Sequence, residues 1–513
     1  MSASNMEIAK KVSSDEDVIL DKERAVEGFD SVAHAKILRK LDVHLLPFVS
    51  LLYLLSFLDR ANVGNAKVAG MAKDADLIGF RYNIIAAVFF VGCVPFFLPF
   101  AHYRQIPYAL AEVPSYVFCT GQLFTCSLAN RNIILKLVRP SRWIPSIMLA
   151  WGLVMTLMCL CKTYHELIIA RVFLGLTEAG LFPGITFYLS LWYRRRDVAS
   201  RVAIFFSAAT VAGAFGGILA FAIEKMEGIG GLHGWQWIFC LEGLAAGASY
   251  FYMHDYPETA TFLSEEERKQ IVHLLKEDSQ DLATHYDRKF VWQAIADYQT
   301  YVQIGIYIGL LIPVYAIALF TPTIVQELGF TAAQAQLLTI PPFVCGCFAT
   351  IAVGLLSDKY NLRGPFVIGS SLVGLVGYII LYTQKSPGAG YAGAVLAAVG
   401  VYPTIAVDLA WAGSIAGGDV RKGVVIAMVI GLGNLGGICS SFIYFQPPYF
   451  HVGHGTIMGF LSLTIILSCF AMWDYNRINK QRDAYCAREG IDAARRAEFR
   501  DMGSESPLFR YTI

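Results

Sequence analysis

The chain has 513 residues, of which 56% are hydrophobic, 13% aromatic and only 16% charged, and its mean hydropathy is +0.50. Soluble domains carry roughly 25% charged residues, so this composition favours an integral membrane protein. The formal net charge is only +1, and no run rich in lysine and arginine is interleaved with aromatic residues, which argues against nucleic-acid binding.

Residues 1–40 form a polar tail without the short apolar core of a cleavable signal peptide. Apolar stretches of about 20 residues, each long enough for one membrane span, then recur along the chain. They lie near 41–58, 143–161, 166–191, 202–223, 237–254, 299–320, 337–356, 365–383, 391–412, 423–444 and 455–473. With one more span inside 82–138, we predict an all-α integral membrane protein with twelve transmembrane helices.

The loops between the predicted spans differ in charge. The loops assigned to the cytosol hold eleven Lys and Arg residues and the opposite loops hold six, so both the N-terminal tail and the tail 475–513 are predicted to be cytosolic. A long polar connection, 255–297, divides the spans into two six-helix halves, 41–254 and 298–474. Within it, Ser264–Glu267 is typical of a capping box that starts an amphipathic surface helix running through Leu275.

The two halves repeat each other. A shift of 220 residues superimposes six pairs of similar residues over two spans and their loop, which indicates duplication. Parallel six-span repeats are typical of transporters that bind substrate between the halves near the middle of the membrane. Individual glycines among the pairs are expected to allow close helix packing. The pairs are Pro183 with Pro403, Phe182 with Tyr402, Arg201 with Arg421, Gly213 with Gly433, Gly216 with Gly436, and Gly217 with Gly437.

The second predicted span is anomalous, because 82–138 is too long for one helix and contains four prolines. Two helices would fit, but a thirteenth span would place Arg194–Arg196 outside the cell, against the charge bias. Residues 91–105 and most of 116–131 can instead be written in codons with intron-like boundaries, and without them one span of ordinary length remains. We predict that both segments are retained introns. A mature cDNA that keeps both would contradict this.

The stretch 171–184 places Arg171, Glu178 and Pro183 inside an apolar span. Arg171 and Glu178 are seven residues apart and therefore share one helix face. A charge in hydrocarbon costs at least about 2.5 kcal/mol, so both must face the protein interior or a water-filled path. The 220-residue shift aligns them with Tyr391 and Ala398, which concentrates the ionic groups in the N-terminal half.

Several stretches together resemble the fungal anion:cation symporter family of the major facilitator superfamily, which contains allantoate and nicotinate permeases. The resemblance covers nearly the whole chain apart from the extreme N-terminus and the two suspected insertions. It implies proton-coupled uptake of a small organic anion by alternating access, with no cofactor or metal. The matching stretches are 58–65, 112–115 continued at 132, 139–143 with 151–152, 171–184, 212–217, 234–239, 255–258 and 509–511.

The candidate residues follow from this chemistry. Arginine suits a carboxylate substrate because its fork donates two parallel hydrogen bonds, and a titratable acid is needed if protons drive uptake. Substrate binding is assigned to Arg171, Arg60, Tyr402, Trp411 and Asn434; proton coupling to Glu178, with Glu112 and Asp408 as lesser candidates; and gating to Asp358, Arg363, Pro183 and Pro403.

Plain structural roles are the alternative for the arginines: Arg171 would pair with Glu178, and Arg60 with Asp59. If the functional assignment holds, Arg171→Ala abolishes uptake without loss of surface expression, and Glu178→Gln removes the pH dependence of uptake. The remaining partners are protons and the lipid bilayer, and we expect a monomer in the plasma membrane.

Two other functions remain open at this point: a nutrient sensor that does not transport, and an exporter of organic ions. A membrane enzyme is not expected, because the sequence shows no His/Asp/Glu metal cluster and no Ser/His pairing.

Overall fold

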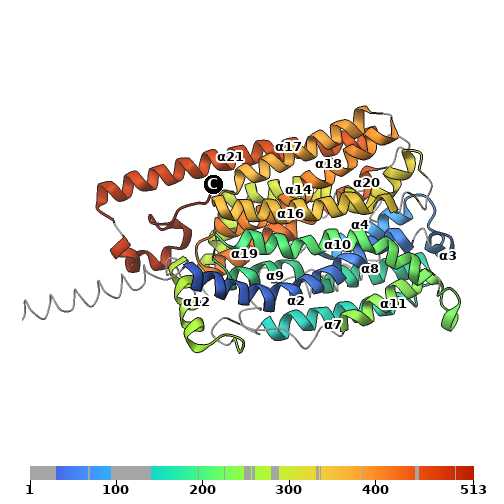
Figure 1. Cartoon of the computed structure of the whole chain (residues 1–513), viewed down its shortest axis with the longest axis horizontal. Coiled ribbons are helices and arrows are strands. Elements are labelled where there is room, and N and C mark those ends of the chain that lie inside the picture. Colours follow the sequence, from blue (N-terminus) through green and yellow to red (C-terminus); the bar gives the residue numbers. More distant parts are fainter. Residues whose placement is uncertain are drawn as a thin grey trace, which may run out of the picture.

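The computed structural model describes residues 31–66, 70–93, 140–247, 256, 260–278, 288–330, 334–444 and 450–513, without residues 179, 195, 225, 335, 336, 385 and 492. The described part is a bundle of long helices that lie side by side (Figure 1). The N-terminal half comprises α2 (Ser31–Ala66), α3 (Ala72–Asp74), α4 (Arg81–Cys93), α7 (Pro140–Met158), α8 (Tyr164–Glu178), α9 (Leu181–Trp192), α10 (Val198–Glu224), η3 (Ile229–Gly231) and α11 (Gly234–Gly247).

Two helices, α12 (Glu265–Asp278) and α13 (Arg288–Ala296), lie in the connection between the halves. The C-terminal half comprises α14 (Tyr298–Glu327), α16 (Ile340–Tyr360), α17 (Gly364–Thr383), α18 (Pro387–Ser414), α19 (Asp419–Gly433), α20 (Leu435–Ile443), α21 (His451–Glu489) and η6 (Ala493–Glu505).

Nine helical stretches of the described part are long and apolar enough to cross a membrane, with α8–α9 and α19–α20 each counted as one. The shorter apolar helices α4 and α7 lie at the second and third predicted spans, and α11 lies at the sixth. The full count of twelve stays a prediction, because residues 94–139 are outside the described part. That range contains Glu112 and, apart from 91–93, both segments suspected to be introns.

Small residues allow the helices to approach closely, as the repeated glycines predict. A Cβ atom at Gly377 of α17 would lie 2.8 Å from Cα of Ala397 on α18. Gly213 of α10 faces the ring of Phe343, where an added Cβ would lie 2.7 Å from Cε1, and Gly433 likewise faces the ring of Tyr307. The packing role expected for these two repeat glycines is therefore confirmed.

One end of the bundle collects the start of α2, the connecting helix α12 and the segment after α21; we call it the linker end (left in Figure 1). The predicted capping box is present, since Ser264 N donates to Glu267 Oε2 (2.9 Å) and Glu267 N donates to Ser264 Oγ (3.2 Å). Lys40 Nζ of α2 also lies 2.7 Å from Glu267 Oε1. Glu267 thus starts α12 and docks it on the N-terminal half.

The hydrogen bonds from Lys40 and then from the Ser264 amide lower the pKa of Glu267 below its ordinary value of 4.5. A lowered pKa in the docked state means that the stabilisation is present near neutral pH and is lost as the pH falls below about 4.5 through the lowered value. We expect hydrogen exchange in residues 260–278 to accelerate a few-fold over this acid range, and to be accelerated already at neutral pH in Glu267→Gln. The matched control is Glu265→Gln, since Glu265 pairs with Lys269 on the exposed surface; equal acceleration in both variants would contradict a docking role.

The segment after α21 returns to the bundle and packs against it, whereas the sequence predicts only a short charged helical tail. Phe509 is fully buried, and Tyr511 stacks on Tyr475 with 5.1 Å between ring centroids. The side chain of Asn479 bonds both the N–H and the carbonyl of Tyr511, at 2.9 Å each. Paired backbone groups and buried rings explain why the segment docks. The family-like stretch 509–511 is the centre of this contact.

Candidate functional site

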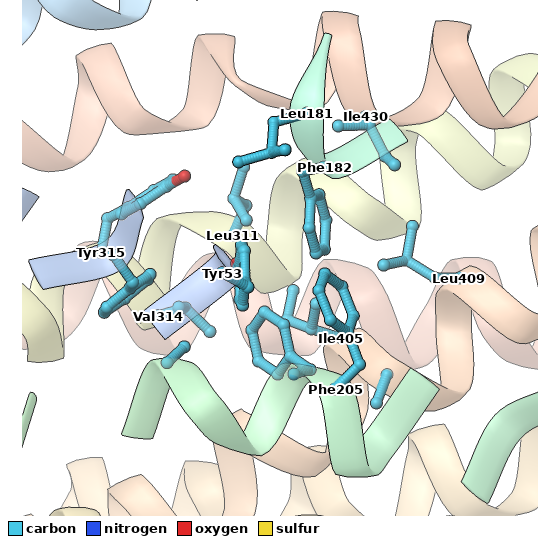
Figure 2. Close-up of a cluster of buried hydrophobic side chains, with 14 of the residues drawn as sticks. Tyr53, Leu181, Phe182, Phe205, Leu311, Val314, Tyr315, Ile405, Leu409 and Ile430 are labelled. Carbon is cyan, nitrogen blue, oxygen red and sulfur yellow. The ribbon is translucent and has the colours of Figure 1, made fainter. Parts of the chain in front are cut away.

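A small cavity lies between the two halves. Its wall is aromatic and aliphatic, with Arg60, Glu178 and Asn434 as the polar exceptions. The rings of Tyr53, Phe182 and Phe205 stand together beside residues of α14 and α18 (Figure 2). An apolar pocket with a few convergent polar groups is the usual form of a small-molecule site. The lining residues are Tyr53, Phe57, Arg60, Glu178, Phe182, Pro183, Phe206, Tyr307, Leu311, Val314, Tyr315, Ile430 and Asn434.

Arg60 of α2 connects the two halves at this cavity. Its NH2 atom lies 2.6 Å from Glu178 Oε1 of α8, and its NH1 donates to the Tyr315 hydroxyl of α14 (2.6 Å). The Tyr315 hydroxyl in turn lies 3.5 Å from Asn434 Oδ1, and Ser56 Oγ donates to Glu178 Oε1. The Arg60 side chain keeps 12% exposure while Glu178 keeps 1%. The cation is therefore the group that a ligand in the cavity could reach.

Arg171 lies outside the cavity, inside the N-terminal half. Its NH1 atom is 3.1 Å from Asp59 Oδ1, and both side chains are almost fully buried. Trp151 Nε1 lies 3.4 Å from the other Asp59 oxygen. The side chain of Arg171 also lies over the ring of Phe239, 5.6 Å from its centroid.

These contacts exchange the partners expected from the sequence: Arg171 pairs with Asp59, and Glu178 pairs with Arg60. Seven residues of α-helix rise about 10 Å, too far for Arg171 and Glu178 to meet directly. Asp59 and Arg60 are adjacent on α2, so their side chains project about 100° apart. Asp59 therefore faces the interior of the N-terminal half, and Arg60 faces the cavity. The alternative of an Arg171–Glu178 pair is wrong for this structure.

The other candidates divide between the cavity and its surroundings. Asn434 and Pro183 line the cavity. Tyr402 lies behind the cavity wall, with 6.4 Å between its ring centroid and that of Phe206, which lines the cavity. Trp411 lies near the linker end, where its Nε1 donates to the carbonyl of Thr512 (2.8 Å).

Asp408 is fully buried, and neither of its carboxylate oxygens has a hydrogen-bond partner within the described residues. It is not among the residues that line the cavity.

The two prolines of the repeat differ in setting. α8 ends at Glu178 and α9 begins at Leu181, so Pro183 lies in the first turn of a helix, where its missing N–H costs nothing. Pro403 lies within the unbroken helix α18. The two prolines assigned to gating are therefore not in equivalent settings: Pro183 follows a helix break beside the cavity, and Pro403 lies within a continuous helix.

Asp358 and Arg363 join the halves at the linker end. Asp358 of α16 accepts hydrogen bonds from the backbone N–H groups of Ala199 (3.2 Å) and Ser200 (2.6 Å) at the start of α10. Arg363 NH1 holds the same carboxylate at 2.7 Å. A carboxylate at a helix N-terminus is stabilised by the unpaired N–H groups and the helix dipole. We call this contact the latch.

The halves also meet toward the opposite end of the bundle. Asn83 Nδ2 of α4 donates to the carbonyl of Ser441 on α20 (2.7 Å). The ring of Phe90 meets Tyr315 with 4.6 Å between centroids. Among the described residues, the halves are thus in contact on both sides of the cavity.

Sequence reasoning missed two parts of the site. Tyr53, Tyr307 and Tyr315 are three of 26 tyrosines, and only the way α14 packs on α2 sets them apart. Glu242 of α11, which accepts a hydrogen bond from Asn62, lies inside the predicted sixth span. Glu178 is selected because it is an acid inside a predicted span, and the same criterion selects Glu242.

Comparisons with known proteins agree with this architecture. The profile of the Major Facilitator Superfamily matches residues 113–441. The chain is 32% identical to the MFS-type transporter cnsO of Penicillium expansum over 511 residues, covering 94% of this chain and 92% of the relative. It is 28% identical to the high-affinity nicotinic acid transporter of Saccharomyces cerevisiae, covering 90% and 82%.

Among solved structures, the proton:xylose symporter XylE superposes with a TM-score of 0.55 at 15% identity, covering 84% of this chain and 95% of that one. This likeness concerns the fold alone. The family match and this shared fold confirm the expected fold class. The chain is therefore an integral membrane transporter and not an enzyme. The chain belongs to the major facilitator superfamily.

Proposed function

We propose that this transporter takes up a small organic anion together with protons, as a member of the anion:cation symporter branch of its superfamily. The observation that carries the proposal is the position of Arg60, a cation at the wall of the cavity between the halves. It is held by a carboxylate of one half and a hydroxyl of the other. An anion that bound there would contact both halves at once.

Competition at Arg60 supplies the coupling. A substrate carboxylate that binds the Arg60 guanidinium leaves Glu178, whose side chain is 1% exposed, without its cation. An unpaired carboxylate in such a place is strongly disfavoured, and protonation removes its charge. Asn434 and Tyr315 lie within reach of the same ligand from the C-terminal half. One anion and at least one proton would then cross together.

The substrate class follows from the pocket and from a relative. Aromatic walls with one arginine suit a small carboxylate, and the nicotinic acid transporter is a relative at 28% identity. Nicotinate, allantoate or a related vitamin or ureide is the class proposed for this chain. We place the linker end in the cytosol, on the charge bias of the loops, and the protein in the plasma membrane.

Uptake of labelled anions by a permease-deficient yeast, at acid and at neutral pH, tests the proposal. The coding sequence without the two suspected introns is expressed beside an Arg60→Gln control. The expected result is acid-stimulated uptake of one class of small carboxylate, abolished by a protonophore and absent in the control. Uptake of a neutral solute or cation, or efflux in place of uptake, would overturn it.

The latch provides a prediction about gating. Asp358→Asn keeps the shape but removes the charge that Arg363 and the α10 N-terminus stabilise. Each such contact contributes about 0.5–2 kcal/mol, so we expect the equilibrium to shift roughly ten-fold toward opening at the linker end. Thiol labelling of a cysteine placed at Lys422, whose Nζ lies 3.4 Å from the Ser190 carbonyl across the same end, measures the shift. Unchanged labelling would show that the latch does not hold the halves together.

A further inference from the structure

The N-terminal half contains a third buried carboxyl that neither the cavity nor the paired arginines account for. Glu242 on α11 is 3% exposed. One of its oxygens accepts a hydrogen bond from the Asn62 side-chain amide on α2. The other oxygen, Oε2, is buried without a hydrogen-bond partner within the described residues.

The charges around Glu242 do not balance. Five ionisable side chains gather on α2, α8 and α11: the cations Arg60, which keeps 12% exposure, and Arg171, and the buried acids Asp59, Glu178 and Glu242. Glu178 uses Arg60 and Asp59 uses Arg171. Among the described residues, Glu242 has only a neutral amide as its partner. An isolated ionised carboxylate in a low-dielectric interior is very costly, so this group must be neutral.

The helix faces show how the third acid is connected to the others. Asp59 and Asn62 are one turn apart on α2, and Phe239 and Glu242 are one turn apart on α11. Arg171 holds Asp59 with NH1 and lies over Phe239, while its NH2 atom is buried with no hydrogen-bond partner in the described part of the chain. One unsatisfied donor and one unsatisfied carboxyl oxygen thus occupy the same cluster.

We propose that Glu242 is a proton-binding site of the transporter, which holds one proton in the state described here and exchanges it with Asp59 around Arg171. The proton leaves a Glu242 oxygen and binds an Asp59 oxygen, while the Arg171 guanidinium turns from Asp59 to the newly charged Glu242. Charge within the cluster is conserved in this step. The exchange rests on the proposed proton coupling, but the protonation of Glu242 does not.

The charged and titratable groups that face this cluster from the packed helices are few. Among the described residues they are Asp59 on α2 and Arg171 on α8, both within electrostatic reach of Glu242; Arg60 on α2, which acts on Asp59; and Tyr82 on α4, which lies near Arg171. Trp151 on α7 contributes a neutral donor to Asp59. In the described part of the chain, Arg171 is the cation within electrostatic reach of both acids, since Arg60 pairs with Glu178, and a single proton divided between Asp59 and Glu242 balances the cluster.

Infrared difference spectroscopy of the purified protein near neutral pH tests the protonation directly. Wild type minus Glu242→Gln is expected to show the carbonyl band of a protonated carboxylic acid. A carboxylate band in its place would overturn the proposal. If Glu242→Gln fails to fold, Asn62→Ala serves instead: loss of the amide donor should shift the same acid band, and an unshifted spectrum in the acid region would count against it.

Proton stoichiometry in proteoliposomes tests the exchange. With an anion found in the uptake panel, Glu242→Gln is expected to lower the number of protons moved per anion by one relative to wild type, because Asp59 then stays ionised against Arg171 and the cluster holds no proton to release. An unchanged ratio would show that the proton is resident and would refute the exchange. Absence of proton-driven uptake in the wild type would instead refute the proposed symport, so the two failures are distinguishable.

Discussion

Replacing Arg60 with lysine is expected to abolish most anion uptake while leaving the protein folded and in the membrane. Lysine keeps the charge but lacks the planar fork that reaches Glu178 and Tyr315 together. Loss of one hydrogen bond to a charged group costs about 1.5–3 kcal/mol, which corresponds to a roughly 10- to 100-fold lower uptake at limiting substrate. Arg60→Gln, without any charge, should be folded but inactive, because Glu178 lines the cavity and can take up a proton when its cation is removed. Initial uptake rates, normalised to surface protein, measure both.

The matched variant is Arg171→Gln, which we expect to prevent folding rather than to impair substrate binding alone. Removing one partner of a buried ion pair destabilises by about 3–5 kcal/mol, because the other charge is left uncompensated, and Asp59 has no exposure through which water could stabilise it. The double variant Asp59→Asn with Arg171→Gln is expected to recover folded protein. Size-exclusion profiles of fluorescent fusions compare the folded state of the wild type, Arg171→Gln and the double variant.

The opposite result would restore the interpretation made from the sequence. There Arg171 is the first candidate for the substrate, and its loss abolishes uptake without loss of surface expression. A folded but inactive Arg171→Gln, beside an active Arg60→Gln, would support that assignment and reject the site built around Arg60.

The fold follows from the sequence more fully than the site does. Spans of about 20 apolar residues, a central polar connection and a capping box are local signals, and α12 begins where Ser264 predicts it. The side of a helix that a charged residue faces is not a local signal. Arg60 and Arg171 both follow the rule for charges in a span. Only the side-chain pairs formed between α2 and α8 decide that Arg60 lines the cavity and that Arg171 lies inside the half.

Contacts across the chain explain the remaining differences. Trp411 is an aromatic residue in a predicted span, and nothing near it in the sequence indicates that the carbonyl of Thr512, 101 residues later, accepts its N–H. Asp358 is different, because the sequence already assigns it, with Arg363, to gating. The structure supplies the missing partner, the start of α10, which the sequence indicates only as a helix end in the other half.

Glu178→Gln is the second variant with a large expected effect, and its effect should differ in kind from that of Arg60→Lys. Glutamine resembles the protonated acid, so it no longer competes with the substrate carboxylate for Arg60. We expect anion binding and exchange to persist at neutral pH, while acid-stimulated accumulation is lost. Counterflow of labelled substrate and net uptake over the range pH 5–8, measured side by side, separate the two activities.

Asp408→Asn is the matched control for Glu178→Gln. Asp408 is equally buried, yet it does not line the cavity and has no described cation to compete for. Asparagine keeps its shape in the neutral form, so the pH dependence of net uptake should remain that of the wild type. If Asp408→Asn loses acid stimulation and Glu178→Gln keeps it, the proton that drives uptake binds in the C-terminal half, and competition at Arg60 is not the coupling step.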